Sequence, residues 1–336
     1  MATTNGLFLN ELTKCGLHAD QMRDYIKNKE VVLVGPAPYL CTEASTQIVI
    51  DTTDVVVRFN NGNNLCEANP SSYGTKTDIL YINQSLRDHS MDSTAIPEAW
   101  SKNGVKFIVF EWDEARDILK QQEDKFTCAI CRKPYQRTDM VSGIEYIDHN
   151  KGGEKRPALA HQQCIVSHIP AYQNSELLYP DIIFVHTSRW RYKKAIKHTV
   201  SSDETMDDIN DRPFTLLLGM NALFDMYTCN ARSIRLTGFD FYSGFFANQK
   251  KRNHAYAPGY ATWEGEITEQ HKDKNGWQKK LLKMFYNQIH DVDSTKQTTK
   301  LYLDHHLQSL LFSHEENQKI LRNKIRQLHE RRMNRN

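Results

Sequence analysis

Short apolar segments recur along most of the chain, and they constrain its fold more than any other feature. The clearest is Val31–Val34, which ends at Gly35, and comparable segments lie at 54–59, 78–82, 105–110, 181–186 and 233–239. Strands that are apolar at nearly every position suit a parallel sheet covered on both faces. Helix-like segments separate several of them. The pattern predicts a Rossmann-like α/β fold, with a doubly wound, mostly parallel sheet.

Three longer segments have helical patterns. Residues 7–29 carry an apolar stripe at helical spacing, residues 213–228 are largely apolar, and residues 299–335 end in a basic third from Lys319 to Arg335. Residues 149–157 have the composition of a loop. We therefore expect four parts: an N-terminal helix over 1–30, a main domain over 31–298, an insertion within it over 126–168, and a basic C-terminal helix over 299–336.

Composition narrows the class of protein. Hydrophobic residues make up 39% and charged residues 25% of the chain, and the net charge is only +2, so bulk charge does not favour nucleic acid as a partner. Neither a signal peptide nor an apolar stretch of about 20 residues is found. The seven cysteines are an odd number, and three of them share a metal-like spacing. These features predict a cytoplasmic protein in a reducing compartment.

Two strand ends carry the candidate ligand-binding residues. The loop that starts at Gly35 can bring its backbone close to a phosphate or a sugar, but it also fits an ordinary tight exit from a strand. Arg58 and the amides that follow it, Asn60 and Asn61 among them, end the second strand. Amides suit a pyrimidine edge or ribose hydroxyls. A turn held by its own asparagine side chains explains them equally well.

The same segments resemble the large sialyl motif (motif L) of animal-type sialyltransferases. The matching elements are Val31–Gly35, Asp54–Asn60 and Tyr73–Asp78, in the family's order and at similar spacing. The resemblance implies a sialyltransferase-type glycosyltransferase fold that binds the CMP part of CMP-sialic acid. It implies that Asn60 contacts the nucleotide and that Gly35 shapes the loop, with Arg58, Asn61 and Thr77 in the same region. Pro36 stands where the family usually has an asparagine.

A later stretch resembles the family's small motif (motif S). It runs from Pro213 and Thr215 through an apolar helix to Cys229, and continues in a strand that ends at Thr237-Gly238-Phe239. A proline in the first turn with a hydroxyl beside it suits an anion-binding helix N-terminus. The resemblance places Thr215 and Gly238 in the donor site. The family's second hydroxyl residue and its glycine after the proline are missing here, so the motif is partly degenerate.

Two histidines are the catalytic candidates. Inverting glycosyl transfer needs a base for the acceptor hydroxyl, and histidine can serve near neutral pH. His254 and His271, seventeen residues apart, resemble the family's motifs III and VS. The resemblance implies that His271 is the general base and that His254 lies on the donor or phosphate side. Gly276 replaces the family's glutamate, and ordinary surface or core histidines remain the alternative. CMP leaves with a single phosphate, so we expect no catalytic metal.

A second group of residues has the spacing of a metal site. Cys128 and Cys131 form one pair and His161 and Cys164 another, with 29 residues between the pairs. Pairs at this spacing can direct both donors onto one tetrahedral zinc ion, and four protein ligands leave no open position. The pattern predicts a structural zinc site in a treble-clef-like insertion. His149 and His168 are spare donors that could replace His161, and four unrelated residues in a long loop remain the alternative.

Two functions are consistent with these patterns. The first is a glycosyltransferase that moves sialic acid, or a related sugar acid, from a CMP-sugar donor to a glycan acceptor. The second is a catalytically inactive, sialyltransferase-like protein that uses its zinc module and basic helix to bind partners or RNA. Pro36, the reduced small motif and Gly276 favour the second function. Arg58 to Asn60 and the two histidines favour the first. No feature of the sequence selects nucleic acid as a partner.

Overall fold

The computed structural model describes the sheet, its covering helices and parts of the insertion. The described residues are 5–16, 19–42, 46–60, 62–82, 100, 103–112, 127–128, 131, 133–134, 141–148, 154–161, 164, 181–188, 191–192, 195–196, 216–241, 276–291 and 299–322.

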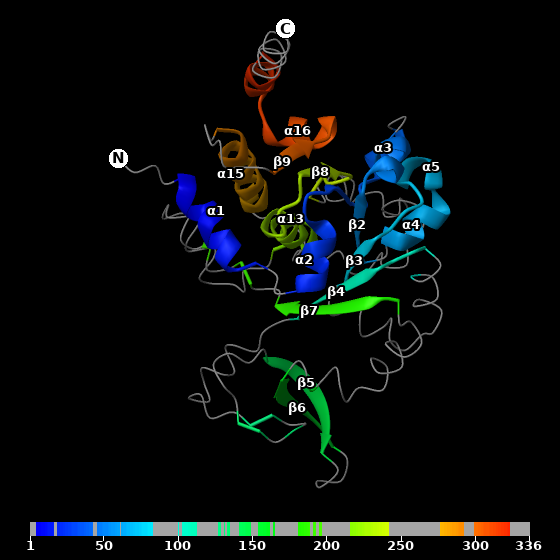
Figure 1. Ribbon diagram of the computed structural model, residues 1–336, viewed down its shortest axis with the longest axis vertical. Coiled ribbons are helices and arrows are strands. Elements are labelled where there is room, and N and C mark those ends of the chain that lie inside the picture. The colour runs from blue at the N-terminus through cyan, green and yellow to red at the C-terminus, as the bar shows by residue number, and fades with distance from the viewer. Residues whose placement is uncertain are drawn as a thin grey trace, which may run out of the picture.

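A seven-stranded sheet forms the centre of the molecule (Figure 1), in the order β7-β4-β3-β2-β1-β8-β9 with every neighbouring pair parallel. The six strands expected from the sequence are all present, and the predicted α/β fold with a parallel sheet is confirmed. Their bounds are β1 Glu30–Val34, β2 Val55–Phe59, β3 Ile79–Ile82, β4 Phe107–Trp112, β7 Ile183–Ser188 and β8 Ser233–Thr237. β9, Lys300–Leu303, is an additional strand at one edge.

Helices cover both faces of the sheet, as the apolar strands require. Val31 and Leu33 of β1 belong to one hydrophobic core, whereas Val32 and Val34 belong to a second core on the opposite face. This division follows from the alternation of side chains along a strand. The first core packs against α1 (Asn5–Lys14), α2 (Asp20–Ile26), α13 (Leu218–Thr228) and α15 (Trp277–Asp291). The second packs against η1 (Pro38–Thr42), α3 (Thr46–Thr52), α4 (Gly62–Ala68) and α5 (Pro70–Tyr73).

The N-terminal segment differs from the prediction of a single helix over 7–29. It forms two helices, α1 and α2, and the break includes Gly16. A Cβ atom added to Gly16 would lie 2.9 Å from the Cβ atom of Thr228, so only glycine fits against the end of α13. Glycine is also a weak helix former. Tertiary packing and local propensity therefore both end the first helix here.

Two other expectations about secondary structure were wrong. The segment 299–335 does not begin as a helix, because β9 pairs with β8 before α16 (His305–Leu311) starts. The segment 149–157 is not all loop, since β6 (Glu154–His161) pairs with β5 (Val141–Asp148) as an antiparallel hairpin that includes Pro157. The hairpin lies apart from the seven-stranded sheet, at the lower end of the view in Figure 1.

The amino-terminal edge of the sheet is held by a buried carboxylate. Asp78, which precedes β3, accepts hydrogen bonds from the Tyr25 hydroxyl at 2.9 Å and from the Val56 amide at 2.9 Å. The ammonium groups of Lys76 and Lys106 each lie 3.2 Å from its oxygens. These contacts tie α2 to the starts of three strands. They lie at the edge opposite to the one where open α/β sheets bind ligands.

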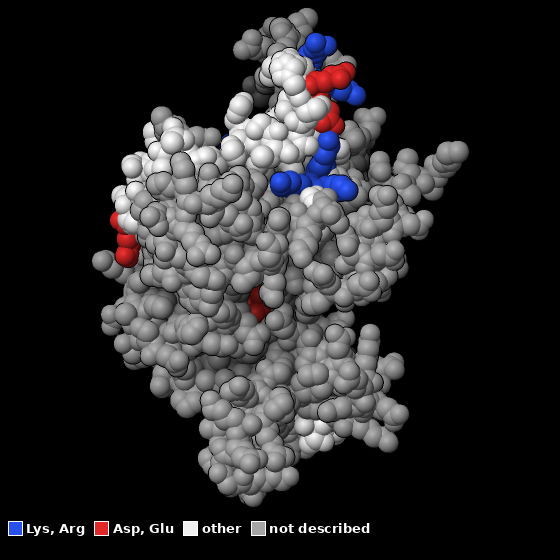
Figure 2. All heavy atoms as spheres, turned by 180° about the vertical axis from the view of Figure 1, so that it is seen from behind, with Lys and Arg blue, Asp and Glu red and all other residues white. Residues whose placement is uncertain are grey.

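The described surface carries both signs of charge. Figure 2 shows basic and acidic side chains close together at the C-terminal end of the molecule, and a pair of this kind, Lys283 and Glu316, lies 2.7 Å apart. No helix in the described part of the chain is both long and apolar enough to cross a membrane.

We predict that the aromatic contacts around Phe224 hold the N-terminal helix to the main core. The ring of Phe224 meets those of Phe8, Tyr192 and Phe285 edge-on, with centroids 5.2 to 5.8 Å apart. Phe224→Ala should lower the free energy of unfolding by about 3–5 kcal/mol, because it removes a fully buried ring. Chemical denaturation measures the loss. Ile48→Ala, at a side chain that is 61% exposed, should change it by less than about 0.5 kcal/mol.

Candidate functional site

Two glycines bring the ends of β1 and β8 into contact. A Cβ atom on Gly35 would lie 2.2 Å from the Gly238 carbonyl oxygen, and one on Gly238 would lie 2.4 Å from the Gly35 carbonyl oxygen. Gly238 also has a φ of +76°, in the left-handed region that favours glycine. The sheet order reverses at this pair, because β2, β3, β4 and β7 follow on one side and β9 on the other. Open α/β sheets bind ligands at such a switch point, outside the carboxyl ends of the strands.

The loop after β1 is a fixed part of this edge. The amides of Gly35 and Ala37 donate to the carbonyls of Thr237 and Gly238, at 2.8 and 2.9 Å. The Tyr73 hydroxyl donates to the Ala37 carbonyl at 3.0 Å. Leu40 is buried in the second core. Hydrogen bonds to the end of β8 and to Tyr73 therefore fix the loop that the sequence predicted after Gly35.

Asn60 lies directly after β2, at the same edge of the sheet. Its φ is +47°, a conformation that asparagine tolerates better than most residues, and its amide donates to the Tyr81 carbonyl at 2.7 Å. The preceding residue, Phe59, packs edge-on against Phe239 with centroids 5.6 Å apart. Phe239 in turn lies beside Gly35. The structure thus brings Gly35, Asn60 and Gly238 to adjacent strand ends.

Arg58 and Thr77 occupy structural positions. The Arg58 side chain is fully buried, and its guanidinium donates to the Thr77 hydroxyl at 3.0 Å and to the carbonyls of Tyr73 and Lys76. Burial lowers the pKa of Arg58 from its ordinary value. Gly74, within the loop that Arg58 holds, has a φ of +71°. These contacts shape the turn before β3, so any effect of Arg58 or Thr77 on a ligand would be indirect.

Several predicted site residues fall outside the described residues: His254, His271, Asn61 and Thr215. The helix expected from Pro213 begins later, at Leu218. The Leu217 amide donates to the Gln278 side chain at 3.0 Å. The start of α13 is therefore bonded to α15, and Pro213 is not in its first turn. Gly276, which precedes α15, has a φ of +64°. This conformation explains a glycine at that position.

A cluster of buried charged residues lies behind the carboxyl edge of the sheet, and the sequence did not predict it. Arg191 donates to Asp225 of α13 with two guanidinium nitrogens, at 2.9 and 2.5 Å, and to Glu111 of β4 at 2.7 Å. The hydroxyls of Tyr81 and Tyr192 donate to Asp225 at 2.8 and 2.6 Å. The Arg191 side chain is only 6% exposed.

Burial and charge pairing shift the pKa values of this cluster in opposite directions. Burial raises the pKa of Glu111 even though Arg191 opposes the shift. Burial works against the charged form of Arg191, but Asp225 and Glu111 together raise its pKa well above the ordinary value. The guanidinium thus stays charged between two carboxyl groups. Only tertiary contacts reveal this arrangement, because the three residues lie on separate elements.

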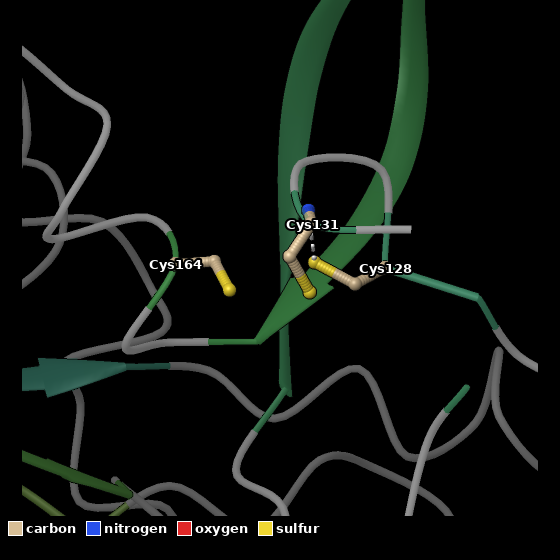
Figure 3. A group of neighbouring side chains, drawn as sticks. All are labelled: Cys128, Cys131 and Cys164. Carbon is tan, nitrogen blue, oxygen red and sulfur yellow. Dashed lines mark hydrogen bonds between the residues drawn. The ribbon is translucent and has the colours of Figure 1, made fainter. Parts of the chain in front are cut away.

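Three cysteines of the insertion come together at the base of the β5–β6 hairpin (Figure 3). The sulfur atoms of Cys128, Cys131 and Cys164 all lie within 4.8 Å of one another. The Cys131 amide faces the Cys128 sulfur at 3.5 Å. The Thr127–Pro134 bridge closes the turn that carries this first pair. The predicted grouping of Cys128, Cys131 and Cys164 is confirmed, and these thiols could hold a metal ion.

The chemistry of the three thiols fits a metal ion. Burial, together with the neighbouring thiols of Cys131 and Cys128, raises the pKa of Cys164 to about 12. Thiolates so close together repel one another, and a bound cation removes this cost. His161, the predicted fourth ligand, is the last residue of β6 and pairs through its backbone with Val141. Its side chain lies outside the described part of the chain, as do His149 and His168.

Comparison with known proteins gives only distant likenesses. No protein-family model matches the chain, and no curated protein matches it. Among solved structures, the sialyltransferase CstII from Campylobacter jejuni, in complex with CMP-3FNeuAc, is 13% identical over 82% of this chain and 79% of that one, with a TM-score of 0.37. An α-2,3-sialyltransferase from Campylobacter jejuni in apo form is 10% identical over 66% and 63%, with a TM-score of 0.31. At TM-scores of this size, no residue's role is transferred to this chain.

We predict that removing the central cation of the buried cluster destabilises the fold in a pH-dependent way. Arg191→Met should lower the free energy of unfolding by about 3–5 kcal/mol near neutral pH, because two buried carboxylates lose their partner. Burial raises the pKa of Glu111 and Arg191 opposes this rise, so removing Arg191 should raise the pKa further. The folded variant then takes up the Glu111 proton at a higher pH than the wild type, and protonation removes the cost of an unpaired buried charge. The loss should therefore shrink as the pH falls from about 7.5 to about 5.5.

Denaturant titrations at both pH values measure this effect. Arg232→Met is a matched control, because Arg232 also lies near two carboxylates, at 3.3 Å from Glu30 and 3.4 Å from Asp54, but is 57% exposed. Its loss should stay below about 1 kcal/mol. Equal losses for the two variants, or a loss in Arg191→Met that grows as the pH falls, would contradict the assignment.

Proposed function

We propose that this chain is a glycosyltransferase that transfers sialic acid, or a related sugar acid, from a CMP-sugar to a glycan acceptor with inversion. One observation carries the proposal. The residues that resemble the large and small sialyl motifs, Gly35, Asn60 and Gly238, lie at adjacent strand ends beside the switch point of a parallel sheet. This is the edge where such sheets bind nucleotides. In this proposal, residues 31–298 form the transferase domain.

In this proposal the nucleotide binds at this edge of the sheet. Gly35 and Gly238 let the two strand ends approach closely, so that backbone groups of both loops lie there. The amide side chains of Asn60 and Asn61 are suited to contacts with the pyrimidine or the ribose. Arg58 and Thr77 hold the turn before β3 and act on the site through it. Thr215 is assigned to the phosphate side by its position in the small motif.

The proposed chemistry uses two histidines. His271 takes the proton of the acceptor hydroxyl as that oxygen attacks the anomeric carbon of the donor sugar. The bond between the sugar and the phosphate oxygen then breaks with inversion, and CMP leaves. His254 lies on the donor side and steadies the phosphate. One phosphate group is a sufficient leaving group, so the reaction needs no catalytic metal.

The insertion over 126–168 has a structural part in this proposal. Cys128, Cys131 and Cys164, with His161 as the fourth ligand, would complete a tetrahedral zinc site. Four protein ligands leave no position for substrate. Zinc there would hold the hairpin to the segments that flank it.

The test of function is turnover by wild type and by His271→Ala. With CMP-sialic acid as donor, His271→Ala should lose about 10²–10⁴-fold in transfer, the usual share of a positioned base. Its affinity for CMP, measured by calorimetry, should stay unchanged because the base acts on the acceptor. His314→Ala, at an exposed histidine of the C-terminal segment, should retain both properties.

Two results would contradict this assignment. Wild-type turnover by His271→Ala would exclude it as the base. A wild-type chain that turns over no CMP-sugar would instead favour a non-catalytic protein that binds partners through its zinc module.

We predict that the purified chain contains about one zinc ion and that Cys128→Ser removes it. Elemental analysis measures the metal, and limited proteolysis of the insertion should speed up in the variant. Cys15→Ser, at a cysteine of the N-terminal segment, should keep the zinc. The affinity of Cys128→Ser for the CMP-sugar donor should equal that of the wild type, because the ion has no role in the chemistry. A zinc-free wild type with a fully protected insertion would count against the site.

A further inference from the structure

Tyr39 bonds to three groups at the edge assigned to the nucleotide. It lies in η1, in the loop after β1, and its hydroxyl donates to the Asp304 Oδ2 atom at 2.5 Å. The same oxygen accepts from the amides of Gly238 and Phe239, at 2.8 and 3.1 Å. A phenol has one donor and room for two acceptor bonds. All three are made here, and they join the loop after β1 to the loop after β8.

Asp304 extends this connection to a third strand end. It follows β9 and caps α16, with Oδ1 accepting from the Leu307 amide at 2.7 Å. Its Oδ2 atom also accepts from the Gly238 amide at 3.1 Å. The ring of His306 stacks on Tyr39 with centroids 4.0 Å apart. One carboxylate thus links β9 and α16 to the Gly35–Gly238 contact.

The two amides that Tyr39 accepts from are consecutive and point at one oxygen. Consecutive amides that converge in this way bind anions in many proteins. Here a phenol and a carboxylate already occupy them. These amides are therefore unsuited to hold a ligand phosphate, and their fixed position instead sets the shape of the backbone at this edge of the sheet.

We infer that Tyr39 and Asp304 are positioning residues of the nucleotide site, which hold the Gly35 and Gly238 loops in the shape that accepts CMP. This inference rests on the proposed function. Neither residue touches the ligand in this assignment. Each acts through the backbone of Gly238 and Phe239. No local pattern in the sequence predicts this contact, because Tyr39 and Asp304 are 265 positions apart.

The test compares two tyrosine–aspartate pairs at opposite edges of the same sheet. Tyr39→Phe removes all three of these hydrogen bonds and should weaken CMP binding by about 3- to 10-fold, because their loss reaches the ligand only through the loop backbone. Amide hydrogen exchange at Gly238 and Phe239 should become faster in the same variant. Tyr25→Phe is the matched control, because the Tyr25 hydroxyl donates to Asp78 at the amino-terminal edge. It should leave CMP affinity and the exchange of Gly238 unchanged.

A second variant separates the contact between Tyr39 and Asp304 from the role of Asp304 as the N-cap of α16. Asn is a good N-cap residue, so Asp304→Asn should keep α16 but weaken the bond with Tyr39. It should lower CMP affinity in the same direction as Tyr39→Phe. Calorimetric titration with CMP, beside exchange measured by NMR, gives both readouts on the full chain.

The outcomes distinguish the inference from the proposed function. If the wild type binds CMP and Tyr39→Phe binds it with the same affinity, the positioning role alone is overturned. An equal loss of affinity in Tyr25→Phe would also overturn it, because the effect would then come from general destabilisation. Failure of the wild type to bind CMP would overturn both assignments.

Discussion

Burial of β1 on both faces is the constraint on which the rest of this structure depends. The side chains from Val31 to Val34 alternate between two hydrophobic cores, so none of these four positions is open to a ligand. Helices must cover both faces to exclude water. Polar groups that serve a ligand are therefore displaced to the strand ends, where Gly35 and Gly238 allow two backbones to meet. The location of the candidate site follows from this displacement.

The interior behind the site contains buried polar groups that are bonded to one another. Tyr81 connects the two regions, because its carbonyl accepts from the Asn60 amide and its hydroxyl donates to Asp225. Asp225 is paired with Arg191, which also bonds to Glu111. Buried ionic groups of this kind add little net stability over an apolar core, but breaking one pair is costly. The cluster thus keeps Asn60 attached to a part of the core that cannot shift without losing several bonds.

The insertion can be large because of where it joins the sheet. It leaves after β4 and returns before β7, and these two strands are neighbours in the sheet. The two strands are parallel, so the connection joins opposite edges of the sheet, and β7 is the terminal strand in the sheet order. Residues added between the last two strands need not displace any other strand. The described contacts of the β5–β6 hairpin lie mostly within itself, and the three thiols gather at its base. Small units commonly depend on a metal or a disulfide for their stability.

Local patterns in the sequence were sufficient for six strands of the sheet and for the grouping of three cysteines. Apolar runs such as Val31–Val34 predicted the sheet, because a strand buried on both faces has few alternatives. The Cys128–Cys131 and His161–Cys164 spacings predicted the thiol cluster, since two residues between ligands place both on one ion. The composition of residues 149–157 led to a wrong prediction, because an edge strand of a hairpin tolerates polar residues and a proline.

Tertiary structure alone decided how distant segments meet. The strand β9 is short and reads as part of a helix, and it becomes a strand only because β8 offers an open edge with unpaired backbone groups. Arg191, Glu111 and Asp225 carry no shared pattern, and Tyr39 and Asp304 are far apart in the chain. Hydrogen bonds between such residues depend on three-dimensional distances that no local spacing encodes. The sequence by itself therefore determined which segments are buried, and the folded chain determined which polar groups those segments bring together.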